Sequence, residues 1–141
     1  MVFVNPGPDE ICQILHSIQT IAVMGLSPNS ARPSFRVARA MQGYGFHIVP
    51  VRPQIREVLG ELAYPDLESL PFKVDMVDVF RAAEHVPAIV ESCIALGIPR
   101  LWLQEGVIHE EAAQRAQAAG IAVVMDRCMW RDYTQLCKQV S

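Results

Sequence analysis

The sequence predicts an α/β fold built on a doubly wound parallel sheet of five strands. Short apolar runs alternate along the chain with amphipathic segments, which is the pattern of parallel strands joined by helices. Apolar residues make up 51% of the composition and charged residues 19%, which suits strands that are covered on both faces. With 141 residues, the chain is expected to form a single domain over 1–141.

The first three elements carry the clearest signals. Residues 8–17 are predicted to form a helix, because a proline and two acidic residues suit its first turn. The continuous apolar run at 20–24 indicates a strand that is buried on both faces. Gly25 then permits a tight turn, and Pro33 suits the first turn of a helix that stops at Gly43.

Four further strands and four further helices follow along the chain. Apolar runs predict strands at 46–51, 74–80, 100–104 and 121–125. Between and after them, helices are predicted at 66–70, 86–96, 110–119 and 131–140. Because crossovers between parallel strands are right-handed, few topologies remain, and the order 2-1-3-4-5 is favoured.

Composition excludes several classes of function. The net charge is −3 and no basic stripe is present, so nucleic-acid binding is not expected. No apolar run approaches the roughly 20 residues of a membrane span. The first ten residues lack a basic region followed by a long apolar region, so no signal peptide is expected and the protein is assigned to the cytoplasm.

Cysteines and histidines give no recognisable metal or redox motif. The four cysteines are Cys12, Cys93, Cys128 and Cys137, and the four histidines are His16, His47, His85 and His109. The cysteine spacings match no CxxC motif, so reduced thiols are expected. No histidine is judged to stand at ligand spacing from a cysteine or another histidine, so no metal site is expected.

The turn after the first strand is a candidate anion site. Free backbone N–H groups and the positive end of a helix dipole would meet there, and Ser27, Asn29, Arg32 and Ser34 add donors. The alternative is an ordinary strand–helix unit that binds no phosphate. The dinucleotide fingerprint would need glycines at 27 and 30, where this chain has serines.

Further polar residues follow the tips of the other strands. Arg52 stands where an NAD site carries an acidic residue, so the pocket suits a ribose-phosphorylated nucleotide, either NADP or coenzyme A. The alternative is a solvated loop arginine. Phe80 ends the third strand, Arg81 follows it, and Gln104 ends the fourth, so these groups are expected to converge near the switch point of the sheet.

Six segments together resemble a known family. They are IAVMGLSPNSARPSFRVA, IVPVRP, LGELAYPDLESLP, VDMVDVFR, LWLQEGV and VVMDRC. In this order and spacing they are similar to the single-domain CoA-binding proteins and to the N-terminal domain of the succinyl-CoA synthetase α subunit. The resemblance implies a Rossmann-like fold that holds coenzyme A across the strand tips. The ligase domain of the synthetase has no counterpart before Ser141, so no ligase activity is carried over.

The resemblance also implies a set of ligand contacts. Around the phosphates it places Gly25, Leu26, Ser27, Arg32 and Ser34; at the adenosine end Val51, Arg52 and Pro53; and along the pyrophosphate and pantetheine Phe80, Arg81, Gln104 and Gly106. The family often has asparagine where this chain has Arg52. At this position the resemblance implies a different adenosine contact, and a cation there suits the 3′-phosphate.

Three functions fit these residues. The first is binding of coenzyme A or an acyl-CoA without chemistry, because no catalytic constellation is visible. The second is an NADP-dependent oxidoreductase that uses the same pocket. The third is a thiol-redox regulatory module, in which Cys128 forms a mixed disulfide with coenzyme A. The expected partner is a small nucleotide ligand. Two other partners are left open: a second copy of the chain, bound through the surface near 101–102 or the C-terminal segment, and an unidentified protein.

Overall fold

The computed structural model describes residues 2–137 and confirms the predicted parallel sheet. The strands are β1 Thr20–Met24, β2 His47–Val51, β5 Met76–Val79, β6 Arg100–Leu103 and β7 Ala122–Met125. Their order, β2-β1-β5-β6-β7, corresponds to the predicted order 2-1-3-4-5, and all four pairings are parallel. The helices are α1 Pro8–His16, α2 Pro33–Gly43, α3 Val86–Leu96, α4 Glu110–Ala118 and α5 Met129–Leu136.

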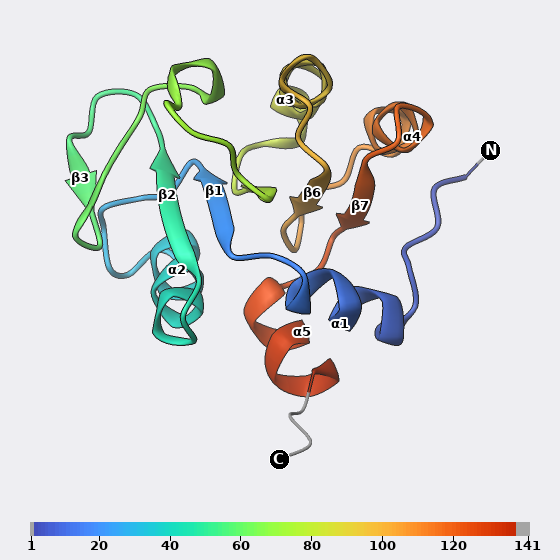
Figure 1. The fold of residues 1–141 in the computed structure, drawn as a ribbon, viewed down its shortest axis with the longest axis horizontal. Coiled ribbons are helices and arrows are strands. Elements are labelled where there is room, and N and C mark those ends of the chain that lie inside the picture. Colours follow the sequence, from blue (N-terminus) through green and yellow to red (C-terminus); the bar gives the residue numbers. More distant parts are fainter. Residues whose placement is uncertain (1, 138–141) are drawn as a thin grey trace.

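The helices cover both faces of the sheet and enclose two cores. Figure 1 shows α3 and α4 on one side of the strands and α1, α2 and α5 on the other. Along β1, Ile21 and Val23 pack toward α1, α2 and α5, whereas Ala22 packs toward α3 and α4. This alternation leaves each strand apolar on both sides, which explains why the strands appear in the sequence as continuous apolar runs.

Three short elements complete the fold. A two-stranded hairpin of β3 Glu57–Val58 and β4 Glu61–Leu62 was not predicted, and it turns through Leu59 and Gly60, both at positive φ. The short helix predicted at 66–70 is the 3₁₀ turn η1 Leu67–Ser69, and a second 3₁₀ turn, η2 Ala83–His85, precedes α3. The last helix begins at Met129 rather than 131, and residues 138–140 of its predicted range lie outside the described residues.

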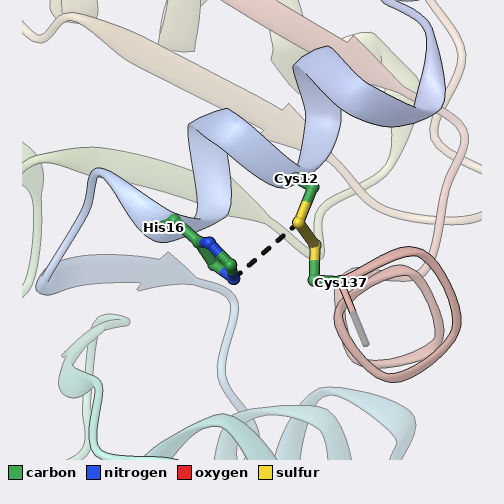
Figure 2. Close-up of side chains that lie close together, drawn as sticks. All are labelled: Cys12, His16 and Cys137. Atoms are coloured by element: carbon green, nitrogen blue, oxygen red, sulfur yellow. Dashed lines mark hydrogen bonds between the residues drawn. A yellow bond between two sulfur atoms is a disulfide. The ribbon is translucent and has the colours of Figure 1, made fainter. Parts of the chain in front are cut away.

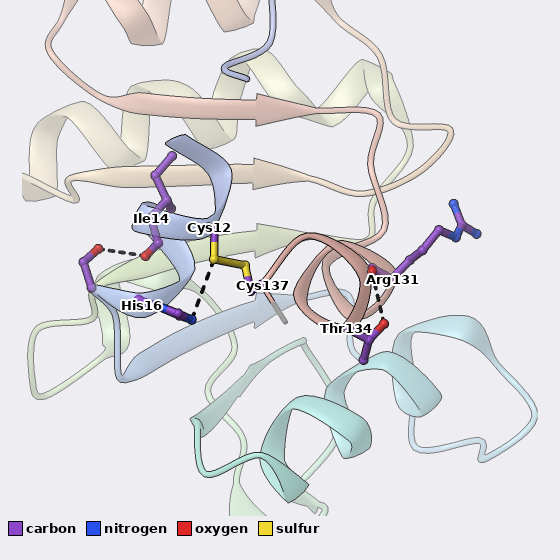
Figure 3. Close-up of a disulfide and its surroundings, with 7 residues drawn as sticks. Cys12, Ile14, His16, Arg131, Thr134 and Cys137 are labelled. Atoms are coloured by element: carbon purple, nitrogen blue, oxygen red, sulfur yellow. Dashed lines mark hydrogen bonds between the residues drawn. A yellow bond between two sulfur atoms is a disulfide. The ribbon is translucent and has the colours of Figure 1, made fainter. Parts of the chain in front are cut away.

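Helices α1 and α5 are joined by a disulfide between Cys12 and Cys137, which corrects the expectation that all four cysteines are reduced thiols. The two Cα atoms are 5.2 Å apart (Figure 3). Cys93 and Cys128 are free, as expected. The sequence argument failed because the two partners are separated by 125 positions, and only the packing of the two helices brings them together.

The burial of β6 bears on the predicted dimer surface. Leu101 and Trp102 are fully buried in β6, so the expectation of a dimer surface around them is wrong. The indole N–H of Trp102 donates to the carbonyl of Arg127 inside the molecule, at 2.8 Å. Across residues 2–137, no helix is both long enough and apolar enough to cross a membrane.

Candidate functional site

A cavity of about 780 Å³ lies where β1, β2, β5 and β6 end. It brings together ten of the thirteen predicted site residues, which are Gly25, Ser27, Arg32, Ser34, Arg52, Phe80, Arg81, Gln104, Gly106 and Cys128. The other three do not line it. Leu26 and Val51 are buried in the core beneath the cavity residues, and Pro53 is exposed on the loop after β2. Asn29, which was expected among the donors of the anion site, also lines the cavity, and Glu105 and Val107 are among the lining residues that were not predicted.

Gly25 allows the tips of β1 and β5 to approach one another. Its φ is 80°, in the region that favours glycine. A Cβ atom at this position would lie 2.5 Å from the carbonyl oxygen of Phe80 and 2.9 Å from Cδ of Arg81. The chain therefore needs glycine here both for the backbone conformation and for space.

The loop between β1 and α2 is held in shape by its own polar side chains. The N–H of Ser27 donates to the buried hydroxyl of Ser34 at 3.0 Å, and the N–H of Asn29 donates to the hydroxyl of Ser27 at 3.1 Å. At the start of α2, Arg32 occupies the N-cap position and makes no side-chain capping bond. The positive end of this helix therefore meets the cavity without a capping oxygen of its own N-cap residue.

Three guanidinium groups line the cavity, and within residues 2–137 none of them forms an ion pair. These are Arg32, Arg52 and Arg81. Within the same residues, three other arginines are paired, in Arg115–Glu91, Arg127–Asp132 and Arg131–Glu105, whereas Arg36, Arg39, Arg56 and Arg100 form no ion pair either. None of those four lines the cavity, so what distinguishes Arg32, Arg52 and Arg81 is that they are grouped around it. Because guanidinium groups match phosphate and carboxylate oxygens, unpaired arginines grouped around a cavity favour an anionic ligand.

The acidic residue at the cavity wall is neutralised by a neighbour. Glu105 accepts two hydrogen bonds from Arg131, at 2.7 Å and 3.3 Å. These bonds, and the positive charge of Arg131, lower the pKa of Glu105. The carboxylate is thereby turned to α5, so it offsets little of the positive charge of the three unpaired arginines.

Gln104 is fixed by a buried carboxyl that the sequence analysis did not assign to the site. The amide nitrogen of Gln104 donates to Oδ1 of Asp78 at 2.7 Å, and both side chains are buried. Burial raises the pKa of Asp78 to about 7, against the opposing effect of the Gln104 hydrogen bond. In the sequence, the signal that could have identified Asp78 is an acidic residue within an otherwise apolar strand.

Among the lining residues that the structure describes there is no histidine or lysine, and the thiol among them is the partly exposed Cys128. Cys128 is the N-cap residue of α5, so its sulfur stands at the positive end of that helix. The arrangement offers backbone N–H groups, cations and one thiol. These groups suit binding of an anionic ligand better than general acid–base catalysis.

Comparison with known proteins finds similarity in both sequence and fold. The family model of the CoA binding domain matches residues 19–134. The protein YneT of Bacillus subtilis is 40% identical over 125 residues, which are 89% of this chain and 93% of YneT. A hypothetical protein from Pyrococcus horikoshii OT3 superposes with a TM-score of 0.89 at 31% identity, covering 97% of this chain and 99% of that one.

A longer relative carries a similar segment. The ADP-forming acetate–CoA ligase I of Archaeoglobus fulgidus is 23% identical over 133 residues. That match covers 87% of this chain and only 19% of the ligase.

Proposed function

The chain belongs to the CoA binding domain family, and on that premise we propose that it binds coenzyme A or an acyl-CoA in the cavity at the strand tips, without ligase chemistry of its own. The observation that carries the proposal is the group of three unpaired arginines around one cavity, Arg32, Arg52 and Arg81. Coenzyme A has a 3′-phosphate and a pyrophosphate, so its charge matches these groups better than that of an unphosphorylated nucleoside.

Each part of the cavity has a role in this proposal. The turn at Gly25, the N-terminus of α2 and Arg32 hold the pyrophosphate, because N–H groups and a helix dipole favour phosphate. Arg52 pairs with the 3′-phosphate. Phe80 and Arg81 lie along the pantetheine arm, and its thiol end points toward Cys128.

The test is a comparison of ligands by isothermal titration and thermal shift. We expect the order of affinity to be coenzyme A, then dephospho-CoA, then adenosine, because each step removes phosphate. Substituting Arg52→Gln is expected to weaken coenzyme A about tenfold or more and to leave dephospho-CoA nearly unchanged. Arg36→Gln is the control, since Arg36 is an exposed arginine of α2 that does not line the cavity.

Two results would overturn the proposal. One is binding of coenzyme A that is no tighter than binding of adenosine. The other is a tighter complex with NADP than with coenzyme A or acetyl-CoA. The second result would favour an oxidoreductase that uses the same cavity, and hydride transfer to carbonyl substrates would then be measured.

Cys128 supports a second candidate function in the same cavity. We propose that its thiolate attacks the disulfide form of coenzyme A, so that a new S–S bond joins Cys128 to one CoA and the other CoA leaves as thiolate. Mass spectrometry after incubation with CoA disulfide should find one adduct on Cys128. The Cys93→Ser variant, which lacks a buried thiol away from the cavity, should still form it, and an adduct absent from Cys128 would dismiss the idea.

A further inference from the structure

Away from the cavity, the facing sides of α1 and the end of α5 carry a cluster of three metal-ligating side chains, Cys12, His16 and Cys137. We propose that this cluster binds one zinc ion when the disulfide between Cys12 and Cys137 is reduced. Figure 2 shows the imidazole of His16 directed at the two sulfur atoms.

The spacing of the ligand atoms fits the coordination sphere of zinc. The three ligand atoms all lie within 4.8 Å of one another. Nε2 of His16 is 3.7 Å from Sγ of Cys12. In a tetrahedral site with ordinary Zn–S and Zn–N bonds, sulfur and nitrogen ligands are about 3.6 Å apart. Reduction frees the two sulfurs to separate to a similar distance, and a metal ion then fits between the three atoms.

The framework holds these ligands in place before any metal binds. Cys12 and His16 are four residues apart on one helix, so they share a face of α1. The buried side chains of Ile11 and Leu15 fix that helix against the core. On the other side, the ring of Tyr133 in α5 stands edge-on to His16, with 6.4 Å between centroids.

The surroundings suit a cation with an open coordination position. Within residues 2–137, a groove over the cluster is lined by Asp9, Cys12, Gln13, His16, Ser17 and Leu136, so one carboxylate lies beside the three ligands. Cys137 is buried, Cys12 is partly exposed and His16 is exposed, so solvent reaches the cluster from one side. Two thiolates and one imidazole leave the fourth position of a tetrahedral ion to water.

The choice of zinc follows from ligand chemistry. Thiolates and imidazole select zinc over magnesium or calcium, which prefer oxygen ligands. Two electrons and two protons first convert the S–S bond to two thiols. Zinc then displaces one proton from each thiol and forms two Zn–S bonds and one Zn–N bond, and both protons pass to solvent. A histidine beside the pair has no role in the disulfide itself, whereas zinc binding uses it as the third ligand.

The experiment uses the full chain and cobalt as a spectroscopic substitute for zinc. The disulfide is reduced with a trialkylphosphine, which takes oxygen from water and becomes the phosphine oxide, and the reagent is then removed without air. Titration with Co²⁺ should give one ion per chain, with thiolate-to-cobalt charge-transfer bands and the ligand-field bands of a tetrahedral site. Added Zn²⁺ should bleach these bands.

The variants separate a metal site from a simple cysteine pair. Cys12→Ser and Cys137→Ser should abolish the charge-transfer bands, and His16→Gln, at an exposed position, should weaken binding about a hundredfold. The matched controls Cys93→Ser and His85→Gln should bind as the parent does. The proposal is overturned if the fully reduced chain, in which all four cysteines react with a thiol reagent, binds no cobalt. It is also overturned if His16→Gln binds cobalt as tightly as the parent.

Discussion

The arginines around the cavity at the strand tips have no ion-pair partner within residues 2–137, whereas the arginines next to and within α5 are paired. The cavity arginines are Arg32, Arg52 and Arg81. In the α5 segment, Arg127 and Arg131 are both paired with carboxylates, and the residue that follows the helix is bonded to α1. Paired charges therefore hold the framework, whereas several unpaired cations grouped around one cavity indicate where an anionic ligand binds.

Two buried carboxyls, Asp132 and Asp78, differ in the same way, because only the first has a cationic partner. Asp132 in α5 receives two hydrogen bonds from Arg127, which precedes the helix, at 2.6 Å and 2.9 Å, so its charge is compensated by a neighbouring cation. Asp78, beneath the cavity, has only the neutral amide of Gln104. Burial without a neighbouring cation raises the pKa of Asp78 to about 7. The carboxyl beneath the cavity therefore titrates near neutral pH.

The largest expected effect comes from opening the bond between α1 and α5. Reducing the disulfide should lower the free energy of unfolding by about 2–5 kcal/mol, because a link across 125 positions restricts the unfolded chain. Urea unfolding with and without a phosphine reductant, both in chelator, measures this. Cys128→Ser should respond to the reductant as the parent does, and Cys137→Ser should not respond at all.

The second effect concerns Asp78 and depends on pH. Because its pKa is raised from 3.8 to about 7, the folded state keeps a proton that the unfolded state releases, so stability falls as the pH rises between these values. Asp78→Asn stays neutral and should gain stability over the parent in this window, by at most about 4 kcal/mol above pH 7. Chemical unfolding of both chains from pH 4 to pH 8 tests it, and a pH-independent difference would contradict the assignment.

The third effect separates two glycines of the cavity. Gly25→Ala should lower the free energy of unfolding by about 2–4 kcal/mol and abolish ligand binding. The new Cβ atom would collide with the carbonyl of Phe80, and the alanine would have to adopt a positive φ. Gly106→Ala has the same conformational penalty with nothing within 4 Å of its Cβ, so it should cost only about 1 kcal/mol. Equal losses in urea unfolding would mean that close approach of the strand tips is not what requires glycine.

The smallest effect compares two ion pairs. Arg127→Gln should cost about 1–3 kcal/mol, because it leaves the buried carboxylate of Asp132 without its cation while the arginine itself is partly exposed. Arg115→Gln breaks a pair with Glu91 in which both side chains are more than half exposed, so it should cost under about 1 kcal/mol. Thermal unfolding ranks the two variants, and a larger loss for Arg115→Gln would reverse the distinction.

The cavity could be predicted from the sequence because topology determines it. Once five apolar strands alternate with helices, the residues that follow each strand meet at one edge of the sheet, whatever their separation along the chain. Gly25, Arg52, Arg81 and Gln104 were found in this way. Asp78 was missed because its role depends on how deeply it is buried, which the alternation of apolar residues does not show.

The α1–α5 face could be predicted only in part. Cys12 and His16 are four apart in a predicted helix, and that spacing alone should have suggested a ligand pair. The position of Cys137 depends on how the two ends of the chain pack together, and no local pattern encodes that contact. The β3–β4 hairpin was missed for a different reason, because each of its strands has only two residues and is too short to show a period of two.

The bond between Cys12 and Cys137 also makes most of the molecule a covalent ring. The whole sheet and the cavity lie inside that ring, and only the segments outside it are open-ended (Figure 1). A tension applied to the two ends of the oxidised chain would therefore pass through the sulfur atoms and leave the strands unloaded. A single backbone cut in any loop of the ring would likewise release no fragment.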